Sequence, residues 1–158
     1  KINENIKFLI AGSGKEKGVI LNYAHEMGVI NKNLFMMDPV AKKELPGLLS
    51  IANIVSSFTI PVDALKYNSA NKFFDGLSAG KPVMINYGGW QKDLLEKTKS
   101  GIAIPPDEPL QAAEILHDFI TNERKLAAYS ASARKLARDQ FSVTNLYKRF
   151  EKTVLAAV

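Results

Sequence analysis

One glycine-rich segment suits the binding of a phosphate group. Residues 12–18 (GSGKEKG) follow the apolar run Ile6–Ala11 and open a helical stretch. Glycines let a backbone approach a phosphate closely, and the N-terminus of the following helix favours negative charge. The spacing is one residue longer than the common dinucleotide fingerprint, and Asp38 ends the next apolar run, where a ribose-binding acid would lie. A dinucleotide site, another nucleotide site and a plain strand-to-helix turn all fit these residues.

A second segment, residues 67–83 (YNSANKFFDGLSAGKPV), is the most specific stretch of the chain. The small polar residues 68–71 suit a helix cap, and backbone N–H groups exposed there would form an anion site. Asn71 and Asp75 are four positions apart, so they share a helix face, and Lys72 lies beside it. These residues fit an anion-binding helix, and they also fit a capped core helix with Asp75 as a solvated acid.

A third segment, residues 86–90 (NYGGW), follows another apolar run. Two glycines between aromatic residues let a backbone approach a ligand, so we expect Gly88 and Gly89 to line a cleft. For Trp90 we expect packing onto the helix behind the loop, with stacking on a sugar or base as the alternative.

The elements that must position these segments alternate between short apolar runs and amphipathic stretches. Continuously apolar strands separated by helices predict a doubly wound α/β fold, with a parallel sheet covered on both faces. In such sheets ligands bind at the carboxyl ends of the strands, so function is expected in the loops after Ala11, Met37, Phe58 and Asn86. The predicted strands are 6–11, 34–37, 54–58, 82–86 and 101–104, and the predicted helices are 15–27, 44–52, 71–79, 91–98 and all of the chain from about 110.

Composition excludes several classes of protein. The 158 residues suit one domain, and the lack of cysteine excludes disulfides, thiolate chemistry and cysteine-based metal sites. Only His25 and His117 offer imidazoles, and both are expected at the surface. The net charge of +5 suits a phosphate-bearing ligand or an anionic membrane surface, although the basic residues are scattered. No nucleic-acid motif occurs, and no apolar run approaches the roughly 20 residues of a membrane span.

Several segments resemble, in order, the carboxyl-terminal domain of family 4 glycosyltransferases. The resemblance runs from about Ile6 to Val158, and NKFFDGLSAGKPV is particularly similar to bacterial enzymes that build O-antigen, capsule and related polysaccharides. It implies a GT-B fold, in which two Rossmann-like domains face each other across a cleft. The segments that carry it are FLIAGSGKEK, LFMMDPVAKKELPGLLSIANIVSS, NKFFDGLSAGKPVMINYGGWQKDLL and SGIAIPPDEPLQAAEIL.

The resemblance also implies a set of donor-binding residues and no metal or cofactor. The backbone of residues 69–72 would hold the donor diphosphate, Asp75 would accept hydrogen bonds from the ribose, and the loop 37–40 would lie against the nucleobase. Tyr67 stands where the family has an earlier glutamate, which leaves open which group contacts the donor sugar, and no catalytic residue is assigned. The expected donor-binding residues are Gly12, Gly14, Met37, Asp38, Val40, Ser69, Ala70, Asn71, Lys72, Asp75, Gly88 and Gly89.

We therefore expect residues 1–158 to form one nucleotide-sugar-binding domain of a longer enzyme, without that domain's first strand and helix and without the acceptor domain. The enzyme would be a retaining, metal-independent glycosyltransferase of bacterial polysaccharide or lipopolysaccharide synthesis. Its partners would be a nucleotide diphosphate sugar, expected to be UDP-linked, and a glycan or lipid-linked acceptor, with no nucleic acid. We expect a cytoplasmic protein that can associate peripherally with the inner face of the membrane, and no transfer by this chain alone. The alternatives are an NAD(P)-binding domain of an oxidoreductase and a non-catalytic α/β interaction domain.

Overall fold

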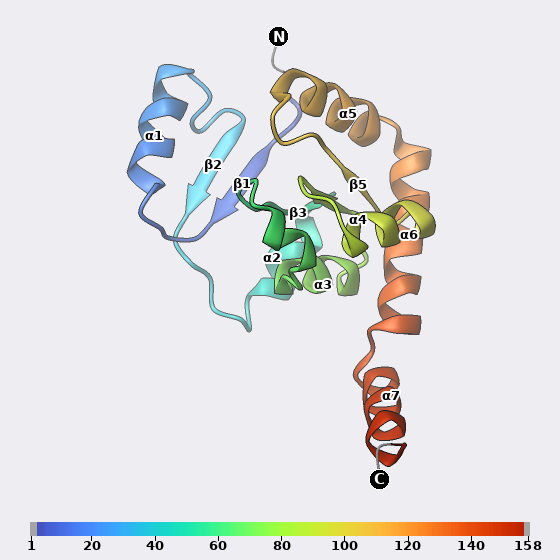
Figure 1. The fold of residues 1–158 in the computed structure, drawn as a ribbon. Coiled ribbons are helices and arrows are strands. Elements are labelled where there is room, and N and C mark those ends of the chain that lie inside the picture. Colours follow the sequence, from blue (N-terminus) through green and yellow to red (C-terminus); the bar gives the residue numbers. More distant parts are fainter. Residues whose placement is uncertain (1–2, 157–158) are drawn as a thin grey trace. The chain divides into compact units, whose positions relative to one another are not determined.

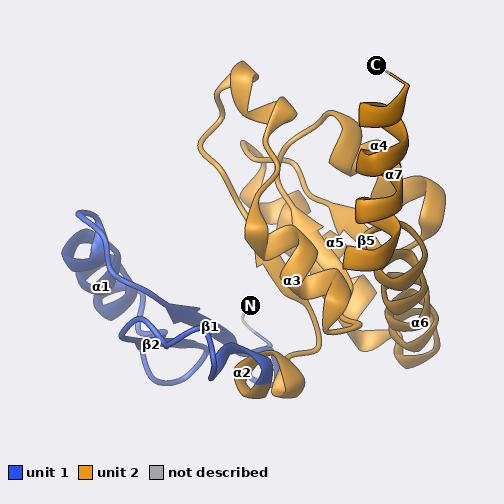
Figure 2. Ribbon diagram, turned by 90° about the horizontal axis from the view of Figure 1, so that it is seen from below, with its two compact units in different colours: residues 1–46 blue, residues 47–158 orange. Residues whose placement is uncertain are grey.

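The computed structural model describes residues 3–156, in which parallel strands alternate with helices (Figure 1). The chain divides into two compact units, the first ending at Pro46 and the second beginning at Gly47 (Figure 2). The boundary falls inside helix α2, Leu45–Ile51.

The first unit contains one pair of parallel strands and a helix. β1 (Phe8–Ala11) pairs in parallel with β2 (Leu34–Met37), and α1 (Lys17–Glu26) connects them. The buried amide of Asn33 donates to the carbonyl oxygens of Asn3 (3.0 Å) and Ile6 (2.8 Å), which fixes the chain where it enters β1. This strand–helix–strand order is the one that the apolar runs predict.

The burial predicted for the first strand is wrong. Phe8, Leu9 and Ile10 keep 42%, 47% and 42% of their surface exposed. A strand is buried on both faces only when other elements cover both, and here a single strand pair accompanies a helix whose one buried residue is Ala24. The apolar sequence therefore identifies the strand correctly but not its surroundings.

The second unit contains a parallel three-stranded sheet in the order β3 (Val55–Ser57), β4 (Val83–Ile85) and β5 (Gly101–Ala103). The central strand is buried on both faces, since Val83, Met84 and Ile85 are at most 2% exposed. This is the environment that its continuously apolar sequence predicts. The parallel α/β class expected from the sequence is confirmed.

Three helices form the core of the second unit with the central strand. α3 (Asn71–Ser78) contributes Phe73 and Leu77, α4 (Trp90–Thr98) contributes Leu95, and α6 (Glu123–Gln140) packs its small and apolar face against them. Gly76 lets α3 lie close to the sheet, because a Cβ atom there would be 2.9 Å from Cγ2 of Val83. The C-terminal half of α3 therefore packs closely on the sheet.

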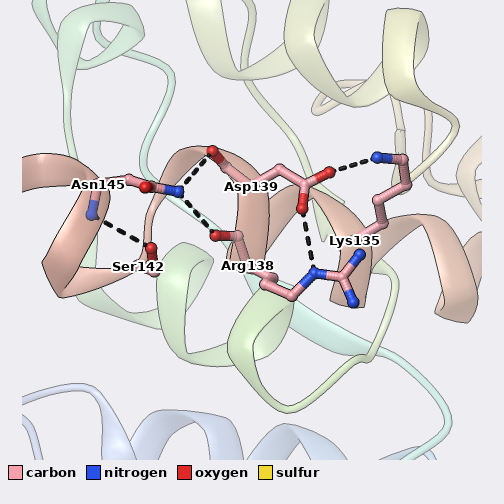
Figure 3. A network of polar contacts seen from close by, with 5 residues as sticks. All are labelled: Lys135, Arg138, Asp139, Ser142 and Asn145. Carbon is pink, nitrogen blue, oxygen red and sulfur yellow. Dashed lines mark hydrogen bonds and ion pairs between the residues drawn. The ribbon is translucent and has the colours of Figure 1, made fainter.

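The corner between the last two helices is fixed by hydrogen bonds (Figure 3). α5 (Pro109–Thr121) precedes α6, and α7 (Val143–Leu155) follows it. The Asn145 amide donates to the carbonyl oxygens of Arg138 (3.2 Å) and Asp139 (3.0 Å) at the end of α6, and the Ser142 hydroxyl accepts from the Asn145 N–H. Hydrogen bonds from Lys135 and then Arg138 to the Asp139 carboxylate lower its pKa from the ordinary value.

The apolar side of α7 is only partly covered by the other described residues. None of its residues is buried, and Phe150 and Val154 are 68% and 45% exposed. The resemblance leads us to expect exposed apolar groups at these two positions, because the final helix of such domains crosses toward a second domain.

Two further observations concern the helices of residues 3–156. A 3₁₀-helix, Asp63–Tyr67 (η1), lies where the sequence predicts a loop, because such short turns have no apolar periodicity to reveal them. No helix within the described part of the chain is long and apolar enough to cross a membrane.

Candidate functional site

In the first unit, two of the predicted segments meet at the carboxyl ends of the strands. The Gly12 N–H donates to the Met37 carbonyl oxygen (3.1 Å), and the Lys17 ammonium lies 2.8 Å from Oδ1 of Asp38. The hydrogen bond from the Lys17 ammonium, together with its charge, holds the pKa of the Asp38 carboxyl below its ordinary value. The glycine-rich segment and Asp38 are thus brought together, and the acid is already paired with a cation.

The other residues predicted in this unit, Gly14 and Val40, have simpler surroundings. The Gly14 carbonyl oxygen accepts from the Lys17 N–H (3.2 Å), which closes the turn into α1. Val40 is half-buried in the loop after β2. The turn agrees with the plain strand-to-helix interpretation, and ligand binding by these residues stays a prediction.

In the second unit, α3 begins without a side-chain cap. Its N-cap is Ala70, not one of the polar residues around it, so the capping expected from residues 68–71 is wrong. Alanine has no side-chain acceptor, and the N–H groups of Asn71 and Lys72 find none among the described residues. Free N–H groups at a helix N-terminus attract an anion, so the missing cap makes this end better suited to a phosphate.

Asp75 lies one turn into the same helix. It is half-buried, and the described residues provide no hydrogen bond or ion pair to its carboxylate. Asn71 is exposed at the position four residues earlier, on the same face, and Lys72 is exposed beside it. An ionised carboxylate only accepts hydrogen bonds, so Asp75 is available to a ligand's hydroxyl groups.

A pocket of about 500 Å³ lies at the carboxyl ends of β3, β4 and β5, within the size range of small-molecule sites. Its polar lining comes from η1, from the loop after β4 and from α4. The polar residues and the glycine that line it are Asp63, Lys66, Asn86, Tyr87, Gly88 and Lys92. Gly88 therefore lines a cavity, as predicted.

Side-chain hydrogen bonds hold two walls of the pocket in place. The Asn86 amide accepts from the Thr59 N–H and donates to the Thr59 carbonyl oxygen, both at 2.9 Å, which joins the loops after β3 and β4. The Tyr87 hydroxyl donates to Gln91 and lies 3.3 Å from the Ser57 hydroxyl. Gln91 is fully buried, and its Nε2 has no hydrogen-bond partner within residues 3–156.

Gly89, the residue before α4, lets η1 lie close enough to form a third wall of the pocket. Its φ of +86° and ψ of −165° are open essentially to glycine alone. A Cβ atom there would lie 2.3 Å from the Lys66 carbonyl oxygen, so only glycine lets η1 approach α4 this closely. Gly89 thus has a packing role, and the ligand contact predicted for it remains untested.

Trp90 packs against other aromatic rings, as expected. Its ring centroid lies 5.7 Å from that of Phe73 and 6.3 Å from that of Phe74, and Phe74 also contacts Phe141. Stacking of Trp90 on a ligand is not needed to explain its position.

The pocket cations Lys66 and Lys92 were not singled out from the sequence. Each lies beside a predicted segment, Lys66 next to Tyr67 and Lys92 two residues after Trp90, and this nearness is the only sequence signal. Tyr67 itself is 74% exposed. The described residues hold no group of three or more His, Cys, Asp or Glu side chains that could bind a metal ion.

No protein-family model matches this sequence, and no curated protein matches it. Several solved glycosyltransferase structures match its fold. HepE from Anabaena, solved in complex with UDP-glucose, has a TM-score of 0.79 at 17% identity and is matched over 98% of this chain and 42% of its own. TarM from S. aureus, solved with fondaparinux, α-GlcNAc-glycerol and UDP, has a TM-score of 0.72 at 18% identity over 92% of this chain and 28% of its own.

A third structure is itself a separate domain. The C-terminal domain of LpcC from Francisella tularensis, a glycosyl transferase group 1 family protein, has a TM-score of 0.66 at 14% identity over 83% of this chain and 66% of its own. The chain thus has the Rossmann-like fold of a GT-B glycosyltransferase domain. It spans less than half the length of HepE.

Proposed function

We propose that this chain is the donor-binding domain of a glycosyltransferase and that it binds a UDP-linked sugar. The observation that carries the proposal is the start of α3, where uncapped N–H groups precede an unpaired carboxylate by one turn. The fold supports it, since HepE and TarM share that fold and were solved with UDP-glucose and UDP.

Each part of the proposed site has a chemical task. The N–H groups of Asn71 and Lys72, with the backbone of Ser69 and Ala70, hold the diphosphate, which the positive end of the helix dipole stabilises. Asp75 accepts hydrogen bonds from the ribose hydroxyls. Binding of this kind positions the donor and stabilises the departing diphosphate, which is how the enzyme would accelerate transfer.

The finer features of the enzyme are proposals on the same basis. We propose that it retains the anomeric configuration, acts on a glycan or lipid-linked acceptor in bacterial polysaccharide synthesis, and binds the membrane surface peripherally. The base-reading loop 37–40 and the glycines at 12 and 14 belong to this proposal as donor-binding residues.

Titration calorimetry with UDP, UDP-glucose and NAD tests the proposed function. UDP should bind and NAD should not, because the acid at the end of β2 is paired with Lys17, while no side chain among the described residues caps the α3 N-terminus. Saturable binding of NAD without UDP binding would instead support the oxidoreductase alternative. If neither nucleotide bound, the non-catalytic alternative would be favoured.

Nucleotide binding should not depend on a metal ion. The diphosphate is assigned to the backbone N–H groups of residues 69–72, which stabilise its charge without a metal ion. The described residues also hold no group of three or more His, Cys, Asp or Glu side chains that could bind one. UDP affinity should therefore be the same in EDTA as in Mg²⁺ or Mn²⁺, as measured by calorimetry. Binding abolished by EDTA and restored by Mn²⁺ would contradict the donor-site assignment.

A further inference from the structure

The pocket at the carboxyl ends of β3, β4 and β5 has positively charged groups that the proposed diphosphate site does not use. The charged residues in its lining are Lys66, Lys92 and Asp63. The Asp63 side chain is fully exposed to solvent at 101%, whereas those of Lys66 and Lys92 are 39% and 44% exposed. Glu96, beside Lys92, is 58% exposed, so both acids are more exposed than the lysines they face, and water screens their charges more than those of the lysines.

Both ammonium groups can still donate hydrogen bonds. Lys66 Nζ lies 3.8 Å from Asp63 Oδ2, and Lys92 Nζ lies 3.8 Å from Glu96 Oε1. These distances exceed that of a hydrogen bond, and neither ammonium group has an acceptor within the described part of the chain. An anionic ligand could therefore take charge-assisted hydrogen bonds from both without breaking an existing one.

The rest of the lining suits a sugar ring. Tyr87 presents an aromatic wall, and its hydroxyl is fixed from behind by Ser57 and Gln91. The Asp63 carboxylate can accept hydrogen bonds from sugar hydroxyls. The side-chain amide of Asn86 is already hydrogen-bonded to the Thr59 backbone, so Asn86 shapes the wall of the pocket and does not bind the sugar. The pocket is built before a ligand arrives, which lowers the entropy that binding costs.

The pocket also lies close along the chain to the proposed diphosphate site. Lys66 is five residues before Asn71, so their Cα atoms are at most about 18 Å apart. The sugar of a nucleotide diphosphate sugar bound at the N-terminus of α3 can therefore reach toward η1.

We infer that this pocket binds a sugar that carries a carboxylate or phosphate group, held by Lys66 and Lys92. The identification of the sugar as part of the donor or acceptor rests on the proposed function. The anionic sugar is either the one transferred from the donor or one at the end of the acceptor, and the chemistry of the pocket is the same for both.

The test compares charged and neutral sugars on the chain as it is. Calorimetry with UDP-glucuronic acid and UDP-glucose measures the donor arm, and ligand-observed NMR with free glucuronic acid and glucose measures the acceptor arm. We expect the acidic sugar to bind at least about five-fold more tightly than the neutral one in one arm, since hydrogen bonds to charged groups are the stronger ones. The double variant Lys66→Gln, Lys92→Gln should abolish this preference.

The quantity compared between variants is the ratio of the affinities for the acidic and the neutral sugar. In this ratio, any effect that the loss of a lysine charge has on binding of the nucleotide itself cancels. The double variant Lys97→Gln, Lys148→Gln is the matched control, because it removes the same two charges from exposed positions on α4 and α7. It should leave the ratio unchanged. Raising the salt concentration should reduce the ratio.

The outcomes separate this inference from the proposed function. A lysine-dependent preference in the UDP arm assigns the charge to the donor, and one in the free-sugar arm assigns it to the acceptor. Equal affinities for acidic and neutral sugars in both arms, or a preference that survives in the double variant, overturn the inference even when UDP binds. Loss of UDP binding alone would contradict the proposed function and leave the free-sugar arm decisive.

Discussion

Replacing Asp75 by alanine should weaken UDP binding about ten-fold or more, because a hydrogen bond to a charged group contributes roughly 1.5–3 kcal/mol. The carboxylate is half-buried and unpaired among the described residues, so nothing in the protein competes with ribose hydroxyls for it. The fold should survive, since the core residues of α3 are its neighbours Phe73 and Leu77. Calorimetric titration with UDP and thermal unfolding of both proteins measure the two effects.

Two variants make the Asp75 result specific. Asp118→Ala removes the same charge from a side chain that is 85% exposed on α5, and it should leave UDP affinity unchanged. Asp75→Asn keeps the shape but loses the charge, so its affinity should fall between those of the wild type and the alanine variant. An Asp75→Ala protein that folds normally and binds UDP with full affinity would remove Asp75 from the site.

The order of strands and helices is predictable because it depends on local pattern. The run Val83–Ile85 is apolar throughout and forms the buried central strand, and α3 begins at the predicted residue. β1 has the same kind of sequence as β4, yet its side chains are 42–47% exposed at three positions. Pattern identifies an element, but burial depends on what covers it, and this is a property of the tertiary structure.

The candidate site was predictable only in part, for a similar reason. The segments at residues 67–83 and 86–90 were found from glycines and small polar residues, whose backbone needs leave a signal in the sequence. Lys66 and Lys92 left no signal beyond their nearness to these segments, because each is an ordinary surface lysine until η1 and α4 bring both to one pocket. The polar cap expected for α3 is absent because the helix begins at the predicted Asn71, which makes Ala70 its N-cap and leaves Asn68 and Ser69 too early in the chain to fill that position.

Replacing Gly89 by alanine should destabilise the second unit by roughly 3 kcal/mol or more, an effect at the upper end for a single substitution. Two causes act together. The backbone at φ +86° and ψ −165° is strained for any residue with a Cβ atom, and that atom would lie 2.3 Å from the Lys66 carbonyl oxygen. Either η1 or the start of α4 must move.

Urea unfolding followed by fluorescence measures this loss where it arises, because the single tryptophan of the chain, Trp90, is the next residue. Gly88→Ala is the matched control, since a Cβ atom at Gly88 would have no neighbour within 4 Å, and its effect should stay within about 0.5 kcal/mol. At low temperature, where Gly89→Ala remains folded, the displaced η1 should carry Lys66 away from Lys92 and reduce any preference for an acidic sugar. If Gly89→Ala unfolded at the same urea concentration as Gly88→Ala, the close approach of η1 to α4 would be absent in solution, and the pocket would lose the wall that places Lys66 in it.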